Sequence, residues 1–186
     1  MSALPVRVFG VDPGGFCTGW GLVQRTGSRI EHIDSGLIRP PRKAVFAERL
    51  AFLHKELTAV LARTSPDHFA IEAVFHAEHA RSALQLGHAR GVLVLAAAQA
   101  GLTVREYPPA TVKKAVTGSG AADKEQVRRM VEMLLKEELD GAADRTDALA
   151  VAICHAHVGD FKAKVKAAED AAKGGGPKKP LRKVRG

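Results

Sequence analysis

Residues 6–24 of the chain read VRVFGVDPGGFCTGWGLVQ. The β-branched and aliphatic run from Val6 to Val11 predicts a buried strand, and the Asp-Pro-Gly that follows it predicts a tight turn. The run from Gly19 to Gln24 predicts a second strand. Because only a short turn separates the two strands, we expect them to pair as an antiparallel hairpin. This hairpin places an acid, Asp12, directly at the end of a buried strand.

Strand and helix patterns alternate along the rest of the chain. Further strands are predicted over residues 30–38, 68–74 and 103–107. Helices are predicted over residues 44–63, 78–100, 108–115, 124–139 and 143–158. The chain thus begins with consecutive strands and continues with strands that alternate with helices. This order is typical of an α/β domain. We therefore expect a mixed five-stranded sheet flanked by helices.

Length and composition restrict the class of protein. The chain has 186 residues, 46% of them hydrophobic and 26% charged, which suits one folded domain with or without a tail. No apolar run reaches the ~18–20 residues that a membrane helix needs. The first residues lack the pattern of a secretory signal. Cys17 and Cys154 form no C-x-x-C pair. We expect a cytoplasmic protein with no membrane partner.

Positive charge is concentrated at the C-terminal end. The formal net charge is +8, and residues 160–186 carry nine Lys and Arg against three Asp and Glu. Residues 174–177 read GGGP and are followed by further basic residues without apolar periodicity. We expect a folded domain over residues 1–160 and a basic, disordered tail over 161–186. The excess charge favours a polyanionic partner, although a solvated tail with no specific role remains an alternative.

Four acids stand in unusual positions. Asp12 could simply be a turn former. Glu72 lies inside an otherwise apolar stretch, where an unpaired carboxylate is costly to ionise, so it lies at an exposed strand end or meets a cation. Asp144 and Asp147 are three residues apart at a predicted helix start and share one face. They could complement the helix dipole, but the residues after Asp147 are almost wholly apolar.

Together these acids suggest a metal centre built from oxygen ligands. Such ligand sets suit Mg²⁺ or Mn²⁺ rather than zinc. Two such ions about 4 Å apart can activate a water and stabilise the leaving oxygen of a phosphodiester. A zinc site built from the histidines near residues 76–79 and 155–157 is disfavoured, because their spacing is not that of a zinc finger.

Several segments resemble the RuvC family of Holliday-junction resolvases. The sequences GVDPG at residues 10–14 and TGWG at 18–21 are similar to the family's opening. The resemblance continues in order through FAIE at 69–72, SAL at 82–84, ARG at 89–91, VK at 112–113 and DRTDALA at 144–150. It covers residues 6–158. No single motif is decisive, but the ordered set is specific.

The resemblance implies a ribonuclease-H-like fold and a homodimer that acts on four-way DNA junctions. It assigns Asp12, Glu72, Asp144 and Asp147 to the family's catalytic, metal-binding acids, with two Mg²⁺ or Mn²⁺ ions per site. Water would attack the phosphorus in line and the 3′ oxygen would leave, giving 5′-phosphate and 3′-hydroxyl ends. Two departures are Ala73 after the strand acid and a cysteine in the turn after Asp12, and neither removes a ligand.

The resemblance also implies DNA-binding residues and partners. Lys113 and Lys124 match basic positions of the family, and Lys124 lies in the first turn of a helix, where an anion is favoured. Phe75 could stack on a base at the branch point, or it could belong to the core. Gly87 and Gly91 suggest helix packing, either across a dimer or against the sheet. A branch-migration complex of RuvA and RuvB is a possible further partner.

Three other functions remain open from the sequence. An actin-like ATPase or sugar kinase also begins with an acid and a Gly-rich phosphate loop, but it needs two such domains and the chain is too short. A nuclease that acts on RNA could share a ribonuclease-H-like site. A non-enzymatic, basic DNA-binding protein is disfavoured, because four acids would repel phosphate in the absence of a metal.

Overall fold

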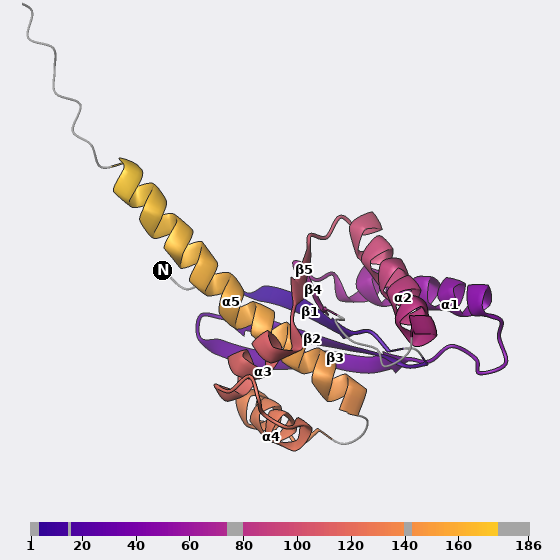
Figure 1. Ribbon diagram of the computed structural model, residues 1–186. Helices are drawn as coiled ribbons and strands as arrows, with labels where there is room; N and C mark the ends of the chain where they lie inside the picture. The colour runs from indigo at the N-terminus through magenta and orange to yellow at the C-terminus, as the bar shows by residue number, and fades with distance from the viewer. Residues whose placement is uncertain (1–3, 15, 74–79, 140–142, 175–186) are drawn as a thin grey trace, which may run out of the picture.

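The computed structural model describes residues 4–14, 16–73, 80–139 and 143–174 (Figure 1). Its strands are β1 (Val6–Asp12), β2 (Thr18–Thr26), β3 (Arg29–Ile38), β4 (His68–Glu72) and β5 (Val104–Tyr107). Its helices are α1 (Phe46–Thr64), α2 (Ala80–Gln99), α3 (Pro109–Thr117), α4 (Lys124–Leu135) and α5 (Ala143–Gly174). The predicted order of elements is confirmed.

The five strands form one mixed sheet in the order β3-β2-β1-β4-β5. The hairpin of β1 and β2 is antiparallel, with Asp12 opposite Gly19, and β3 continues the antiparallel part. β4 and β5 run parallel to β1. The parallel strands β1 and β4 therefore end at the same edge of the sheet, with Asp12 and Glu72 as their last residues. We call this edge the acid edge.

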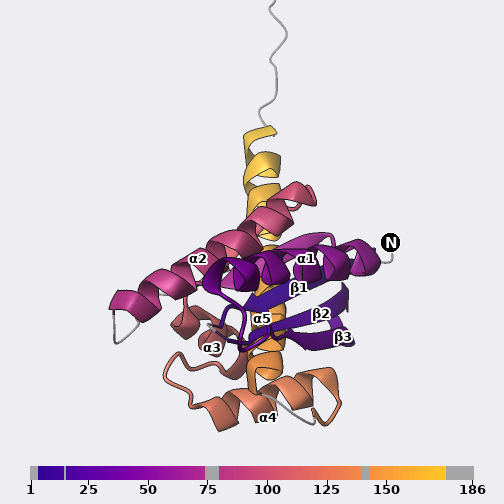
Figure 2. The ribbon, with the colours of Figure 1, turned by 90° about the vertical axis from the view of Figure 1, so that its right-hand side faces the viewer.

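Helices cover both faces of the sheet (Figure 2). Helices α1 and α2 pack on one face around Phe9, whose ring stacks on Trp20 with 5.5 Å between ring centroids. Helices α3, α4 and α5 pack on the other face with Val8 and Val23. Alternate residues of β1 thus enter opposite cores, as the period of a strand requires. Each face buries a hydrophobic core, and the sheet between them fixes the acid edge.

Helix α5 lies unusually close to the hairpin because two glycines leave room for it. A Cβ on Gly10 would lie 2.3 Å from the carbonyl oxygen of Ala148. A Cβ on Gly19 would lie 1.9 Å from the carbonyl oxygen of Asp144. Both obstacles are helix backbone, which cannot rotate away. The glycines therefore allow the first turn of α5 to reach the acid edge.

Two helix ends differ from the sequence-based predictions. Helix α4 ends at Leu135 rather than near residue 139, because Lys136 adopts the left-handed conformation (φ 56°) and donates its N–H to the Glu132 carbonyl. Helix α5 continues to Gly174, well past the predicted end at residue 158 and into the predicted tail. The added residues are rich in Ala and Lys, which have high helix propensity.

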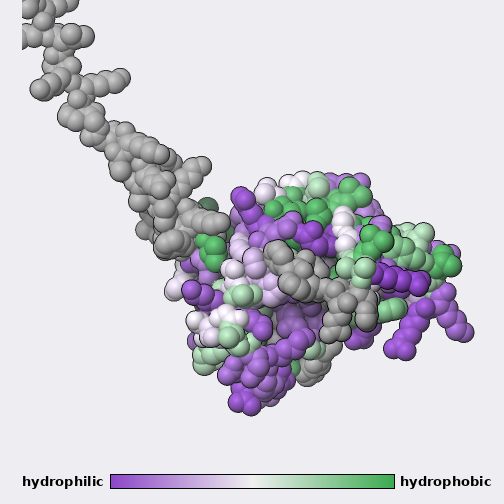
Figure 3. Space-filling model, in the orientation of Figure 1, coloured by the Kyte–Doolittle hydropathy of each residue, from purple (hydrophilic) through white to green (hydrophobic). Residues whose placement is uncertain are grey.

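Helix α2 leaves part of its surface uncovered by the described residues. A Cβ on Gly87 or Gly91 would meet nothing within 4 Å in this part of the chain, so packing of these glycines against the sheet is wrong. Leu84 is 64% exposed and Leu95 is 50% exposed. Figure 3 shows hydrophobic surface on the α2 side of the molecule.

Among the residues that the structure describes, no helix is both long enough and apolar enough to span a membrane.

Candidate active site

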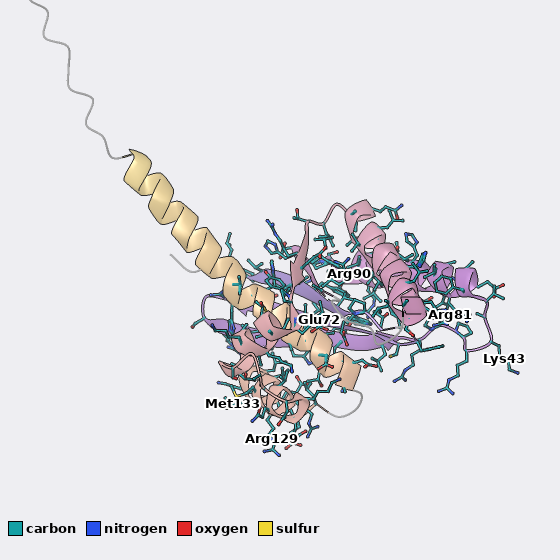
Figure 4. All side chains as sticks on the ribbon, in the orientation of Figure 1. Lys43, Glu72, Arg81, Arg90, Arg129 and Met133 are labelled. Carbon is teal, nitrogen blue, oxygen red and sulfur yellow. The ribbon has the colours of Figure 1, made fainter. Side chains whose placement is uncertain are left out.

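The fold brings the four predicted acids together from three elements. Asp12 ends β1, Glu72 ends β4, and Asp144 and Asp147 lie in the first turns of α5. All four are partly buried. Glu72, labelled in Figure 4, is the last residue of β4 and is half-buried rather than exposed. The charges of Lys124 and Lys113 lower its pKa, so of the two explanations offered from the sequence the nearby cation applies.

Asp12 is the most strongly perturbed of these acids. Burial, followed by the charges of Glu72 and Asp147, raises the pKa of Asp12 from 3.8 to about 8. A hydrogen bond to the Glu72 side chain and the charge of Asp144 raise it further. The pKa of Asp12 is thus raised first by burial and then by neighbouring negative charge, which a nearby cation would offset.

Glu72 is the acceptor in this carboxyl pair. Burial raises the pKa of Glu72, whereas the hydrogen bond from Asp12 lowers it. The charge of Asp147 raises the pKa, and those of Lys124 and Lys113 lower it. The net shift is upward. The opposite signs of this hydrogen bond on the two pKa values make Asp12 the donor and Glu72 the acceptor.

Lys124 is in direct contact with one of the acids, Asp147. It begins α4 just after Asp123. The Asp123 side chain accepts a hydrogen bond from the Gln126 N–H at 2.8 Å, and the Gln126 Oε1 accepts one from the Asp123 N–H at 3.0 Å, which forms a capping box. The Lys124 Nζ lies 3.4 Å from Asp147 Oδ2. Asp147 chiefly raises the pKa of Lys124, although burial opposes it. Its side chain is 80% exposed, so this ion pair is weak and the amine can move to another anion.

The site fits a divalent cation in its chemistry, although the side chains do not yet enclose one. All four candidate ligands are carboxylates, the donors that Mg²⁺ and Mn²⁺ prefer. After burial, the negative charges of the other three acids raise the pKa of Asp12, and a bound cation would offset these charges. In the part of the chain that the structure describes, no three Asp, Glu, His or Cys residues are grouped so that they could hold a metal ion.

The family model described as crossover junction endodeoxyribonuclease RuvC matches residues 8–155, well over half of the chain. The chain belongs to the RuvC family. The match spans β1 through most of the buried part of α5 and includes all four acids.

Relatives and solved structures agree with this RuvC assignment. A crossover junction endodeoxyribonuclease RuvC from Azorhizobium caulinodans is 49% identical over 152 residues, which cover 82% of this chain and 90% of that protein. The RuvC of Caulobacter vibrioides is 50% identical over 157 residues, covering 84% and 93%. A structure of Thermus thermophilus RuvC in complex with a Holliday junction substrate has a TM-score of 0.79 at 31% identity, covering 84% and 96%. The ribonuclease-H-like fold expected from the resemblance is confirmed.

Two residues beside the acids of this RuvC chain, Cys17 and Arg39, were not predicted as site residues. The Cys17 thiol is within hydrogen-bonding reach of Asp144 and of Arg39. Burial and then Asp144 raise the pKa of Cys17, whereas Arg39 lowers it. Ile38 pairs with Thr18 across β3 and β2, so Arg39 comes opposite Cys17. The register of the β2–β3 pair, once assigned, would have located Arg39.

Some predicted residues of the RuvC site cannot be placed. Phe75, which was expected to stack on a base, lies outside the described residues, as do His76 and His79. Lys113 is described, on α3, and its charge acts on Glu72. Both lysines predicted to contact phosphate are thus on the acid side of the α3–α5 layer.

Proposed function

We propose that this chain is an endonuclease that resolves four-way DNA junctions by paired, symmetric nicks. The observation that carries the proposal is the convergence of Asp12, Glu72, Asp144 and Asp147 at the acid edge of a RuvC-family fold. The T. thermophilus neighbour, which resembles this chain over most of its length, was solved with a Holliday junction substrate. Junction DNA is therefore the substrate that we assign.

The four carboxylates would hold divalent cations, Mg²⁺ or Mn²⁺, two per site. When bound, these ions supply charge that activates a water and stabilises the leaving 3′ oxygen. Asp12 must lose the proton that it donates to Glu72 in order to act as a ligand. Hydrolysis would leave 5′-phosphate and 3′-hydroxyl ends, which a ligase can join.

The lysines would position the scissile strand. Lys124 lies in the first turn of α4, where free backbone N–H groups also attract an anion. Because its amine is exposed, it can exchange Asp147 for a phosphate oxygen as DNA binds. Lys113 approaches the acids from α3. The two would neutralise phosphates beside the carboxylates that would otherwise repel the strand.

A homodimer would supply two sites for the two strands. The uncovered face of α2 supports this assembly. Leu84, Gly87, Gly91 and Leu95 follow one another at spacings of three or four residues, so they lie on one side of the helix. Two exposed leucines flanking two glycines allow close approach of a second α2. A two-fold axis through this face would match the symmetry of a four-way junction. Association with RuvA and RuvB rests on family membership alone.

Cleavage of a synthetic four-way junction tests the proposal. The junction should be able to branch-migrate through varied sequence, and a linear duplex of the same arms serves as the comparison. Reactions contain Mg²⁺, Mn²⁺ or a chelator, with the wild-type chain, Asp12→Asn, Glu72→Gln and the distant control Asp34→Asn. We expect paired nicks in the junction alone, lost with chelator, reduced at least about 100-fold by Asp12→Asn or Glu72→Gln and unchanged by Asp34→Asn.

Two outcomes would overturn this assignment. Cleavage of the linear duplex at the same rate as the four-way junction would show that the chain does not select junctions. Tight junction binding without nicks in either metal would make the chain a binding protein. Mapping of the product ends by ligation separates hydrolysis at the 3′ oxygen from hydrolysis at the 5′ oxygen.

A further inference from the structure

Phe16 carries an exposed aromatic ring in the turn between β1 and β2. Its side chain is 68% exposed, and the guanidinium carbon of Arg49 lies 4.2 Å from the ring centroid. A guanidinium over one ring face is a cation–π contact that holds the ring in place. A single exposed hydrophobic residue needs no explanation by itself, so the surroundings of the pair decide its meaning.

The surroundings of Phe16 are basic and lie at the acid edge. The turn begins directly after Asp12. Because Ile38 pairs with Thr18, the segment that leaves β3 starts at the same edge, and it carries exposed Arg39, Arg42 and Lys43. Figure 4 shows Lys43 at the same end of the molecule as Arg81, which lies in the first turn of α2. Acids also lie in this region: Glu48 is tied to the Val45 N–H at 3.2 Å, and Glu56 lines a pocket together with Arg39.

This basic surface flanks the acids from the side opposite the lysines. Arg49 belongs to α1, which packs on one face of the sheet. Lys113 and Lys124 belong to the layer of α3, α4 and α5 on the other face. A DNA strand that crosses the acid edge would therefore meet the lysines on one side of the carboxylates. On the other side it would meet the ring of Phe16.

The chemistry of this surface selects nucleic acid over a protein partner. Guanidinium and amine groups bind phosphate, and an exposed ring flanked by them offers a surface on which a base can stack. A stacked base gains about 1–3 kcal/mol in comparable sites, equal to a fivefold to hundredfold change in affinity. Junctions expose bases at the point where strands exchange, so a partner for the ring is available beside the cleaved phosphate.

We propose that Phe16, held by Arg49, is a stacking platform for a base of junction DNA beside the scissile phosphate, and that Arg39, Arg42 and Lys43 bind the adjoining phosphates. The inference deepens the proposed function and depends on it. Phe16 contributes binding and position, and the carboxylates carry out the chemistry. Loss of the ring should therefore weaken binding and misplace the strand without altering the product ends.

Fluorescence of 2-aminopurine placed at successive positions around the junction centre tests this directly. The titrations are run with chelator present, so that cleavage does not interfere. Phe16→Leu keeps an apolar side chain but removes the ring, Phe16→Trp keeps a ring, and Met133→Ala changes an equally exposed residue on α4. We expect Phe16→Leu to weaken junction binding about fivefold to hundredfold and to relieve quenching at one or two positions. Phe16→Trp should restore both signals, and Met133→Ala should change neither.

Arg49→Ala should reproduce part of the Phe16→Leu effect, and the double variant should be no weaker than Phe16→Leu alone, because both changes remove one platform. Wild-type chain that neither binds nor cleaves junctions would overturn the proposed function. If the wild-type chain cleaves junctions but Phe16→Leu shows the same affinity and the same quenching as the control Met133→Ala, the stacking platform is overturned and the proposed function stands. Circular dichroism of each variant shows that the fold is retained.

Discussion

The carboxyl group of Asp12 donates a hydrogen bond to the carboxylate of Glu72, across neighbouring parallel strands. This pairing exists because both strands end at the acid edge. Burial and three neighbouring acids make the proton on Asp12 stable up to a pH of about 8. A divalent cation bound beside the pair would favour loss of this proton, and the consequences can be measured.

Without divalent ions, Asp12→Asn should stabilise the fold increasingly as pH rises. The pKa of Asp12 is about 8 in the folded chain and 3.8 as its ordinary value, so the folded state binds the extra proton between these values. The contribution of Asp12 to the free energy of unfolding thus falls from pH 4 to pH 8. At pH 8.5 we expect Asp12→Asn to be more stable by about 2 kcal/mol, or roughly 4–8 °C in Tm.

Thermal melts at pH 5 and pH 8.5, with and without Mg²⁺, check this expectation. Mg²⁺ should raise the Tm of the wild-type chain at pH 8.5 more than that of Asp12→Asn. A difference in Tm that stays constant across pH would mean that Asp12 does not hold a proton in the folded chain.

Lys124→Ala should reduce the salt dependence of junction binding. If Lys124 neutralises one phosphate, its loss lowers the slope of log affinity against log salt by about one. The matched control is Lys55→Ala, an exposed lysine on α1, in the layer on the other face of the sheet. Binding titrations from 50 to 200 mM salt measure both slopes. If the slope of log affinity against log salt is the same for Lys124→Ala and the wild-type chain, Lys124 does not contact phosphate and its role is limited to the ion pair with Asp147.

Gly19→Ala should disturb both stability and catalysis, because the new methyl group would lie 1.9 Å from the Asp144 carbonyl oxygen. The clash is with backbone, so the first turn of α5 must move, and Asp144 moves with it. We expect a loss of about 3 kcal/mol or more in unfolding free energy and a large loss of nicking. At Gly21 the obstacle is the Leu149 side chain at 2.6 Å. Gly21→Ala should therefore be partly rescued by Leu149→Ala, whereas no side-chain change should rescue Gly19→Ala.

Leu84→Asp combined with Leu95→Asp should convert a dimer to a monomer. Both leucines lie on the uncovered side of α2, where two buried charges would have no partners. Sedimentation should show half the mass, and junction nicks should become single rather than paired. Met133→Asp, at an equally exposed position on α4, serves as the control. A wild-type chain that sediments as a monomer, or a double variant that remains dimeric, would contradict the assignment of α2 as the interface.

Local sequence patterns determined much of this fold and the composition of its site. The apolar run before Asp12 and the short turn after it fixed the hairpin, because both depend on neighbouring residues. The Asp123 and Gln126 pair marked the start of α4 for the same reason. The four acids were recognisable because each interrupts or borders an apolar segment, where a carboxylate is costly.

The tertiary structure alone decided how these parts meet. The contact of Arg49 with Phe16 and the approach of Arg39 to Cys17 join residues from separate elements. Such contacts depend on strand register and on which face a helix covers, and neither is written in a short stretch of sequence. The closeness of α5 to the hairpin likewise follows from Gly10 and Gly19 lying under its backbone. Sequence thus supplied the chemical groups, while packing of distant segments set the charges and distances that make them a site.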